Sequence, residues 1–370
     1  MIPRGLDRTP PGPAVFDRFS VPKGRRLIAI SDIHGNLPYL RGLLEKLSFS
    51  RDDTLVIVGD ILEKGPYSLE TLQYVMALCR EYDVHPLCGN CDFWHEFCDD
   101  PCDEQMDAWQ RQYLVGRNKG WGDGLIAQML GRIGIAIEPG MDLPAARRAV
   151  AAAFPEEIAF LKALPHIAET EDYVFVHGGY CPERGRYACM KFDNYRAHAK
   201  PHEKWTIVGH WPVVLYGEDI VSANPVIDED LRLISIDGGC VLKDDGQLNA
   251  LILPGMETVY YDPFPQVRVG RDQRANDRHY YIRHGDNLVR PLRNEGEFTL
   301  CEHIRTGYRM EILTDFLRRE TELGVFAVND CTDYRLPLRA GDEISIVRRT
   351  GRGYLCKHRG VSGWYDGPVE

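Results

Sequence analysis

Five short apolar runs, each leading into a glycine-flanked polar residue, constrain the fold of this 370-residue chain more than any other feature. The runs cover residues 27–30, 55–58, 84–87, 173–176 and 206–208, and the polar residues after them are Asp32 and His34, Asp60, Asn90, His177 and His210. Apolar runs of this length, rich in β-branched residues and bounded by glycine, are typical of strands buried on both faces. We therefore expect strands that end in polar side chains.

Two helical patterns separate the first three runs. The leucines from Leu37 to Leu47 share one helix face behind Asn36 as N-cap, and a second helix begins with Ser68 as its cap. This alternation of strands and helices predicts a parallel sheet with right-handed crossovers. Ligands of such sheets bind outside the carboxyl ends of the strands, where all six polar residues fall.

Any one of these polar residues could be an ordinary turn residue, but six at equivalent strand ends favour a common site. Their carboxylate, imidazole and amide groups suit Mn, Fe or Zn better than Ca or Mg, which prefer oxygen ligands alone. Six ligands exceed the need of one ion, so we expect two divalent or trivalent ions that share Asp60. Two ions ~3.5–4 Å apart can hold a phosphoryl group and activate water near neutral pH.

The sequence blocks around these residues resemble those of a known family. The blocks are Ser31–Gly35 (S-D-I-H-G), Gly59–Glu70 (G-D-I-L-E-K-G-P-Y-S-L-E), Gly89–Asp92 (G-N-C-D), His177–Gly179, Gly209–Pro212 and Ile236–Cys240. In order and spacing they are similar to the calcineurin-like metallophosphoesterases, and most of all to the serine/threonine phosphoprotein phosphatases. The resemblance extends over about residues 25–255.

This resemblance implies a four-layer α/β sandwich that hydrolyses phosphomonoesters with a metal-activated hydroxide. It implies one ion held by Asp32, His34 and Asp60, and a second held by Asp60, Asn90, His177 and His210. Trp211 and Pro212 follow His210, whereas many phosphodiesterases of the superfamily place a second histidine two residues on. The phosphatase branch is therefore favoured.

The chain departs from the family pattern at the residues that would bind phosphate and protonate the leaving group. Cys91 and Glu63 stand where the family has a histidine and its paired aspartate, and Lys64 stands where it has an arginine. Lysine lacks the bidentate fork of arginine, and a thiolate cannot donate a proton. Because general acid catalysis is worth ~10²–10⁴-fold, we predict a preference for good leaving groups. The candidate catalytic residues are Glu63, Lys64, Cys91 and Asp92.

Several alternatives stay open. The substrate could be a dinucleoside polyphosphate, a nucleotide or a cyclic phosphodiester, or the chain could be a degenerate phosphatase that acts as a binding module. A structural zinc site could form from four thiols, those of Cys88, Cys91, Cys98 and Cys102. His95, three residues beyond Asp92, could replace the missing acid.

Composition limits the partners and the compartment. The formal net charge of −11 argues against general binding to nucleic acid or to anionic membranes, so we expect a phosphorylated protein or small molecule as substrate. No apolar run approaches the ~20 residues of a membrane span. Eleven cysteines, an odd number scattered along the chain, fit a reducing cytoplasm better than a disulfide framework.

The domain organisation follows from shifts in pattern. We expect a flexible leader over residues 1–24 and a catalytic domain over residues 25–270. Within it, residues 93–154 form an insertion of the kind that acts as a lid or specificity cap. Residues 271–370 alternate strand-like runs and turns and resemble a bacterial SH3-like module, which would bind a peptide or cell-wall ligand or dock on the catalytic domain.

Overall fold

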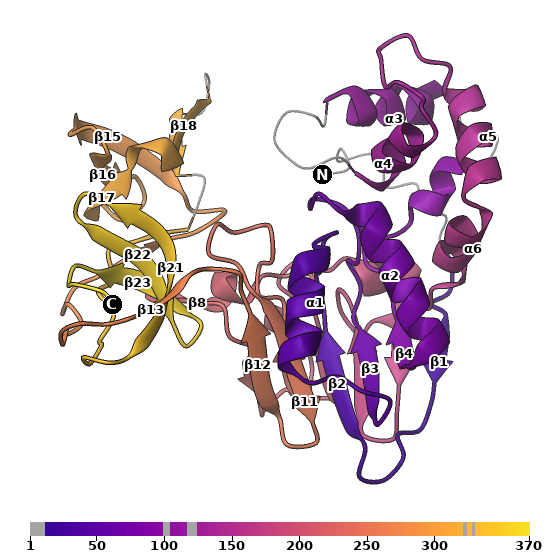
Figure 1. Cartoon of the computed structure of the whole chain (residues 1–370), viewed down its shortest axis with the longest axis horizontal. Helices are drawn as coiled ribbons and strands as arrows, with labels where there is room; N and C mark the ends of the chain where they lie inside the picture. Colours follow the sequence, from indigo (N-terminus) through magenta and orange to yellow (C-terminus); the bar gives the residue numbers. More distant parts are fainter. Residues whose placement is uncertain (1–11, 99–103, 117–123, 321–323, 328–329) are drawn as a thin grey trace. The chain divides into compact units, whose positions relative to one another are not determined.

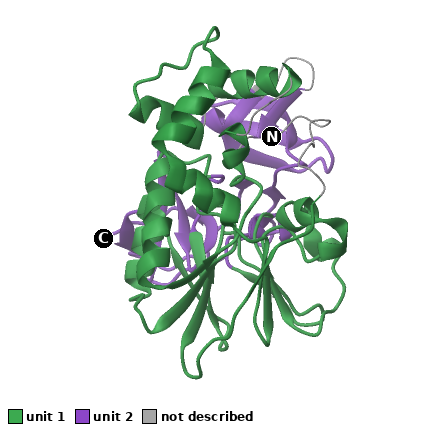
Figure 2. Cartoon of the chain, turned by 90° about the vertical axis from the view of Figure 1, so that its right-hand side faces the viewer, with its two compact units in different colours: residues 1–211, 225–241, 248–261 green, residues 212–224, 242–247, 262–370 purple. Residues whose placement is uncertain are grey.

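The computed structural model describes residues 12–98, 104–116, 124–320, 324–327 and 330–370. By compactness the chain divides into two units, which Figure 2 shows in different colours. Unit 1 comprises residues 1–211, 225–241 and 248–261, and unit 2 comprises residues 212–224, 242–247 and 262–370. Compact units need not coincide with domains, so the expected boundaries after residues 24 and 270 stay predictions.

Unit 1 contains two mixed sheets. The first has the strand order β12-β11-β2-β3-β4 (Figure 1), with bounds Glu257–Tyr261, Leu248–Leu253, Arg26–Ile30, Asp53–Ile57 and Asp83–Pro86. The second has the order β1-β5-β6-β7-β10-β9, with bounds Phe16–Arg18, Ile167–Glu169, Tyr173–Val176, Trp205–Val208, Leu233–Ser235 and Val226–Asp228. Strands β2, β3 and β4 are parallel to one another, and β6 is parallel to β7. All five expected strands are present, divided between the two sheets.

The two sheets pack face to face through a common apolar core. Ala29 and Val56 of the first sheet are fully buried in one cluster with Phe175 and Ile207 of the second. The other face of the first sheet, which carries Ile28, packs against the helices. This α/β layering places loops from both sheets where they can meet, and the site described below is built from those loops.

Helices α1 (Leu37–Lys46) and α2 (Ser68–Glu81) cover the first sheet, as expected. Asn36 is the N-cap of α1, but its side chain forms no capping hydrogen bond. Ser68 is not a cap, because Tyr67 occupies that position in α2. The Ser68 hydroxyl instead accepts a hydrogen bond from the Glu63 backbone N–H (3.0 Å), which fixes the loop that precedes the helix.

The expected insertion is helical. It consists of the 3₁₀ helix η1 (Trp94–Cys98) and helices α3 (Glu104–Gly116), α4 (Leu125–Arg132) and α5 (Leu143–Ala153), followed by α6 (Pro155–Ala163). These helices gather beside α2 in Figure 1. Asp142 caps α5, since its Oδ1 accepts a hydrogen bond from the Ala145 N–H (3.0 Å). Action as a lid stays a prediction.

The N-terminal segment differs from the expected flexible leader where the structure describes it. Residues 1–11 lie outside the described part of the chain. Beyond them, Phe16–Arg18 form strand β1, which pairs in parallel with β5. The sequence does not reveal this three-residue strand, because the segment is rich in proline, glycine and arginine. Strand β1 also pairs with a strand that is distant in the sequence.

Unit 2 is built from antiparallel strands. One sheet has the order β13-β21-β22-β23-β8, with bounds Gln266–Arg268, Glu343–Thr350, Gly353–His358, Val361–Tyr365 and Val221–Ser222. Another has the order β17-β16-β15-β19-β18, with bounds Arg309–Leu313, Phe298–His303, Leu288–Asn294, Gly324–Ala327 and Leu317–Glu320, and β14 (Tyr281–Ile282) pairs with β20 (Cys331–Thr332). The expected β-rich region is thus present, and its SH3-like character stays a prediction.

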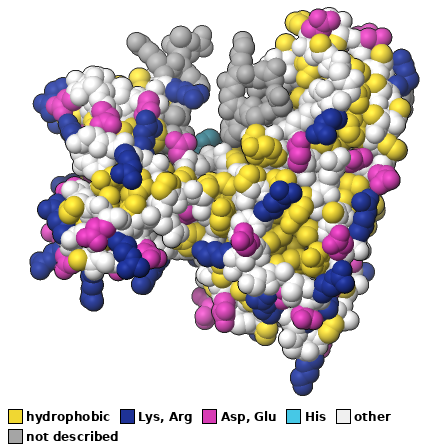
Figure 3. All heavy atoms as spheres, viewed as in Figure 1, with side chains coloured by type: hydrophobic (Ala, Val, Ile, Leu, Met, Phe, Trp, Pro, Cys, Tyr) yellow, Lys and Arg dark blue, Asp and Glu magenta, His cyan; other side chains and the backbone are white. Residues whose placement is uncertain are grey.

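The surface carries charges of both signs. On the face drawn in Figure 3, acidic and basic side chains are interspersed, with apolar side chains between them. Within the residues that the structure describes, no helix is both long and apolar enough to cross a membrane.

Candidate metal centre

The predicted ligands lie on the loops after β2, β3, β4, β6 and β7, and they converge on Asp60. His34 Nε2 lies 3.6 Å from Asp32 Oδ1 and 3.6 Å from Asp60 Oδ2. His177 Nε2 lies 3.2 Å from Asp60 Oδ1, and the His177 and His210 rings are 5.3 Å apart between centroids. Asp60, His177 and His210 offer ligand atoms within 4.8 Å of one another. One carboxylate is thus flanked by histidines from both sheets.

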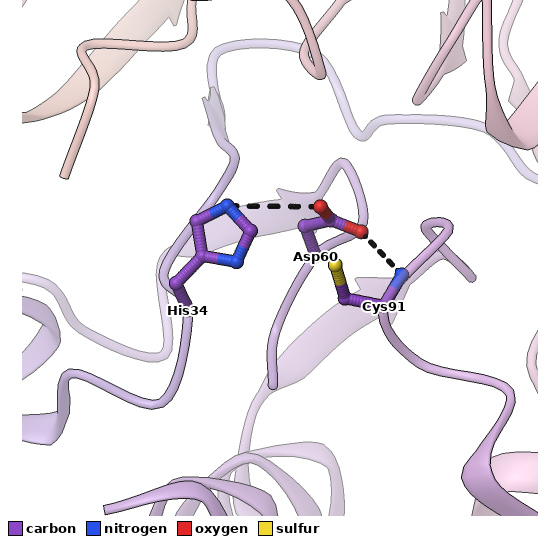
Figure 4. A group of neighbouring side chains, drawn as sticks. All are labelled: His34, Asp60 and Cys91. Carbon is purple, nitrogen blue, oxygen red and sulfur yellow. Dashed lines mark hydrogen bonds and ion pairs between the residues drawn. The ribbon is translucent and has the colours of Figure 1, made fainter. Parts of the chain in front are cut away.

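A second group places a cysteine in the same centre (Figure 4). Ligand atoms of His34, Asp60 and Cys91 also lie within 4.8 Å of one another. The Cys91 backbone N–H donates to Asp60 Oδ1 (2.8 Å), and Asn90 Nδ2 donates to the Cys91 sulfur (3.3 Å). The structure therefore brings all six predicted ligands together, with Cys91 among them. Their binding of metal stays a prediction.

The loops hold an unusual backbone conformation. Six residues of the site have positive φ: Asp32 (56°), His34 (52°), Asp60 (49°), Glu63 (72°), Lys64 (66°) and His210 (66°). Such angles cost about 1–3 kcal/mol each for residues other than glycine and persist only where surrounding structure enforces them. Here the Asp32 N–H donates to the Gly59 carbonyl (3.1 Å) and the His34 N–H to the Asp60 carbonyl (2.9 Å), so neighbouring loops enforce each other's shape.

Two glycines permit the close approach of these loops. A Cβ at Gly209 would lie 2.5 Å from Asp32 Oδ2, and a Cβ at Gly89 would collide with the backbone and carboxylate of Asp60. Real side chains do not tolerate such contacts, so the glycines after β7 and β4 are required for space. The glycine that flanks each polar residue in the sequence thus has a direct structural cause.

Backbone carbonyls orient the two buried histidines. His34 Nδ1 lies 3.3 Å from the Leu62 carbonyl oxygen, and His177 Nδ1 lies 2.8 Å from the Val58 carbonyl oxygen. A ring N–H that donates to a carbonyl fixes the tautomer and leaves Nε2 with its lone pair. Both Nε2 atoms face Asp60. This is the usual arrangement of histidines that bind a metal ion.

Buried acceptors without partners fit the same interpretation. Asp32 Oδ1 and Asn90 Oδ1 are buried and make no hydrogen bond to any residue that the structure describes. Leaving such atoms unsatisfied costs free energy, and bound cations would satisfy them. A mixture of carboxylate, imidazole and amide suits metal ions of intermediate hardness. The residues present therefore fit a pair of ions.

Burial and Asp60 determine the protonation of these groups. Burial raises the pKa of Asp60, but the nearby His177, His34 and Lys64 together lower it further, so the pKa falls well below its usual value. Burial and then Lys64 lower the pKa of His34 to about 3. Burial by itself lowers the pKa of His177, but the neighbouring carboxylates of Asp60 and Asp32 act in the opposite direction. The net effect raises the pKa to about 10. Asp60 and His34 are therefore in metal-binding forms, whereas His177 must first release a proton.

Lys64 places a positive charge beside the carboxylates. Its Nζ lies 3.1 Å from His34 Nε2 and 3.9 Å from Asp60 Oδ2. Burial lowers the pKa of Lys64, but the nearby Cys91 and Asp60 raise it above its usual value. The ammonium group is therefore charged at any physiological pH. Its predicted contact with phosphate stays a prediction.

Glu63 is held by two contacts from the insertion, and its predicted part in catalysis stays a prediction. The carboxylate is buried and accepts hydrogen bonds from the Tyr113 hydroxyl of α3 and from the Leu125 N–H (2.7 Å) at the start of α4. Burial, reinforced by Asp92 and Asp60, raises its pKa to about 8. These contacts favour a positioning role, in which Glu63 joins the loop of Lys64 to the insertion.

Asp92 also braces the loops. Its Oδ1 accepts from the Leu62 N–H (3.1 Å) and its Oδ2 from the Gly89 N–H (2.8 Å), and the side chain is fully buried. Burial and then Asp60 raise its pKa to about 7. A carboxylate whose two oxygens both bind backbone amides holds the loops after β3 and β4 together. The predicted part of Asp92 in catalysis stays a prediction.

Sequence reasoning gave no role to Asp237, although its block had been recognised. Asp237 follows β10, is fully buried, and its Oδ1 accepts from the Gly239 N–H (2.8 Å). Its Oδ2 makes no hydrogen bond to the described residues, and burial and then Asp32 raise its pKa to about 8. The signal was the same as elsewhere, an apolar run ending in Asp-Gly. Tyr113 had no such signal, because its contact with Glu63 spans 50 residues.

The alternative of a zinc site built from four thiols is not seen among the residues that the structure describes. Cys91 groups with His34 and Asp60, whereas the Cys88 thiol donates to the Gly89 carbonyl (3.5 Å). Cys102 lies outside the described residues. The proposal that His95 acts as an acid stays a prediction.

Comparison with known proteins identifies the class. Residues 25–230 match the model of the calcineurin-like phosphoesterase family. The chain therefore belongs to this family of metal-dependent phosphoric ester hydrolases, as its sequence blocks predicted.

Curated relatives give a narrower similarity. The chain is 43% identical over 67 residues to the symmetrical bis(5'-nucleosyl)-tetraphosphatase of Neisseria gonorrhoeae (strain NCCP11945), which covers 18% of this chain and 24% of the relative. It is 31% identical over 104 residues to the protein of the same name from Pseudomonas putida, which covers 23% and 35%. The matched segments thus span only about a quarter to a third of those relatives. They do not single out the serine/threonine phosphatases.

Among solved structures, a metallophosphoesterase from Sphaerobacter thermophilus matches with a TM-score of 0.36 and 18% identity. The match covers 64% of this chain and 86% of that chain.

Proposed function

We propose that this chain hydrolyses dinucleoside polyphosphates by cleaving a phosphoanhydride bond. The observation that carries the proposal is the thiol of Cys91 at the position where the family resemblance implies an imidazole acid. A nucleoside phosphate leaves as a stable anion and needs little protonation, whereas a serine or threonine alkoxide needs an acid. The names of the curated relatives support the same substrate class.

The predicted ligands would hold the two ions of such a hydrolase. Bound ions would supply Lewis acidity toward phosphoryl oxygens and acidify water. The chain's own contribution is orientation and charge: Lys64 adds a fixed positive charge toward the phosphate chain. Glu63 and Asp92 keep the loops in place through their hydrogen bonds to backbone and to Tyr113. Mn, Fe and Zn remain the proposed metals.

An aromatic stack near this loop supports a nucleotide substrate. The Trp94 and Tyr113 rings are 4.7 Å apart, the Trp109 and Tyr113 rings 5.4 Å, and the two tryptophans 6.0 Å with planes only 11° apart. All three side chains are partly exposed. The Tyr113 hydroxyl donates to Glu63, which ties the stack to the loop of Lys64. We propose that one nucleobase stacks here while the phosphate chain reaches the ions.

The test compares three substrates on metal-loaded protein: a dinucleoside tetraphosphate, inorganic tetrapolyphosphate and an aryl phosphomonoester. We expect the highest kcat/KM for the dinucleotide and cleavage into two nucleoside diphosphates. Trp109→Leu should raise KM for the dinucleotide roughly 5- to 150-fold, the worth of one stacked base. The base-free polyphosphate is the matched control and should be unaffected. Faster hydrolysis of the monoester would overturn the proposal.

The second candidate is a phosphomonoesterase that resembles the serine/threonine phosphatases. Trp211 and Pro212 after His210 favour it. A degenerate binding module is disfavoured, because all six predicted ligands are retained. We also keep the cytoplasm as the proposed compartment, since the scattered, odd number of cysteines does not suit a disulfide framework. A peptide or cell-wall ligand stays a proposal for unit 2.

A further inference from the structure

Cys91 stands apart from the other cysteines because its thiol faces two predicted metal ligands. Figure 4 shows its sulfur beside Asp60, whose carboxylate also faces His34. We propose that Cys91 binds the ion held by His34 and Asp60, as a thiolate ligand of the metal centre. Neither the family resemblance nor the names of the relatives assigns this role. The proposal concerns metal binding and does not depend on which phosphate compound is the substrate.

The distances suit sulfur coordination. A metal such as zinc binds thiolate at ~2.3 Å, imidazole nitrogen at ~2.0–2.1 Å and carboxylate oxygen at ~2.0–2.2 Å. Two ligand atoms on opposite sides of one ion are therefore at most ~4.5 Å apart. The ligand atoms of His34, Asp60 and Cys91 all lie within 4.8 Å of one another. Shifts of a few tenths of an ångström, together with withdrawal of the Lys64 ammonium that now lies 3.1 Å from His34 Nε2, would place one ion among them.

Two hydrogen bonds fix the position of Cys91 beside Asp60. Asn90 Nδ2 donates to the Cys91 sulfur (3.3 Å), which places a hydrogen-bond donor on it from the adjacent residue. The Cys91 backbone N–H donates to Asp60 Oδ1 (2.8 Å) and so fixes the residue relative to the carboxylate. A hydrogen-bonded sulfur held in this way is suited to share electron density with a cation.

Cys88 supplies an internal comparison. It lies three residues earlier and is buried. Its thiol donates a hydrogen bond to the Gly89 backbone carbonyl (3.5 Å). It belongs to neither group of ligand atoms found among the described residues. The two cysteines lie in the same segment, Cys88 buried and Cys91 half-buried, and they differ in what their sulfur faces.

The chemistry has two consequences. Formation of the metal–sulfur bond converts the Cys91 thiol to a thiolate, and the proton passes to solvent, so binding of the ion releases one proton more than it would without this ligand. Thiolate also shifts preference toward Zn, Co and Fe and away from Mg and Mn. A thiolate bound in this way has no proton to give to a leaving group.

Cobalt spectroscopy on the full chain tests the proposal. Chelator-treated protein is loaded with Co²⁺ and its near-ultraviolet absorption is recorded, because sulfur-to-cobalt charge transfer produces a band that nitrogen and oxygen ligands do not. We expect the band in the unmodified protein and in Cys88→Ser, and its loss in Cys91→Ser. Cys91→Ser should also release one proton fewer when the ion binds.

A second measurement uses only the unmodified protein, so it tests the proposal even if a variant fails to fold. X-ray absorption at the zinc edge of the unmodified, zinc-loaded protein should show one sulfur neighbour at ~2.3 Å. A cobalt protein that holds its metal but lacks the band would overturn the proposal, as would a band that vanishes in Cys88→Ser and persists in Cys91→Ser. Inactivity toward dinucleotides alongside a normal band would instead contradict only the proposed substrate.

Discussion

Both units of this protein bury charged side chains, but they satisfy them by different means. In unit 2, Lys357 is only 1% exposed. Its Nζ donates to the Asp245 carbonyl (2.8 Å) and to Gln247 Oε1 (2.7 Å), and it lies 3.6 Å from Asp262 Oδ2. The buried ammonium is therefore surrounded by acceptors from its own unit.

Unit 2 also buries carboxylate oxygens without a hydrogen bond, those of Asp262 and Asp330, but each of these residues is paired with a lysine. Unit 1 differs. Around Asp60 it buries Asp32 and Asn90 with acceptor oxygens that make no hydrogen bond to the described residues, and it arranges histidines so that their Nε2 atoms face the same point. Buried charges that are paired by the chain itself contribute to a specific fold. Buried acceptors that the chain leaves without partners point to something bound. The comparison thus distinguishes a structural cluster around Lys357 from a functional cluster around Asp60.

The strongest test of this difference is Asp60→Asn. Because Asp60 is shared by both groups of ligands, we expect kcat to fall by at least ~10³-fold and the bound metal to fall below one ion per chain. Metal analysis and steady-state kinetics measure this. An active, fully metal-loaded variant would mean that the carboxylate is structural and that the comparison is mistaken.

Lys357→Met tests unit 2. The substitution leaves Asp262 without its buried cation, which should cost ~3–5 kcal/mol of unfolding free energy. Urea denaturation measures the loss, and kcat below the transition should not change. Lys23→Met, at an exposed position, is the control and should stay within ~0.5 kcal/mol. Equal stability of the two variants would show that the cluster around Lys357 contributes nothing.

Metal binding should stabilise the protein through unit 1. Addition of Zn²⁺ or Mn²⁺ to chelator-treated protein at 100 times its dissociation constant should add about 2.7 kcal/mol to the unfolding free energy. Calorimetry should record a higher Tm in the unmodified protein and in Lys357→Met, but not in Asp60→Asn. A similar gain in Asp60→Asn would place the bound ion elsewhere.

Glu63→Gln gives the smallest expected effect, and it depends on pH. The pKa of Glu63 is raised to about 8 in the folded protein, so its contribution to stability is present at low pH and is lost as pH rises through 8. Metal-free protein should therefore lose about 2 kcal/mol between pH 6 and pH 8 from this residue. Glutamine does not ionise, so the Tm difference between variant and parent should grow with pH. A difference independent of pH would contradict the raised pKa.

Sequence reasoning reached further in unit 1 than in unit 2. The strands around the site could be predicted because each is a continuous apolar run with a polar, glycine-flanked end, and the same signal pointed to all six predicted ligands. The contact of Tyr113 with Glu63 could not be predicted, because no local pattern reports a hydrogen bond between distant helices. For the same reason, no local pattern predicts that strand β8 (Val221–Ser222) pairs with β23 (Val361–Tyr365).

The left-handed backbone at Asp32, His34 and Asp60 has a consequence for anyone who wishes to copy this centre. A short peptide of the same sequence would adopt ordinary extended or helical backbone dihedral angles, since nothing would compensate the steric cost of positive φ. The shape belongs to the pair of interlocked loops, and those loops need both layers of strands behind them. A transplant that moves the motif must therefore move its scaffold as well.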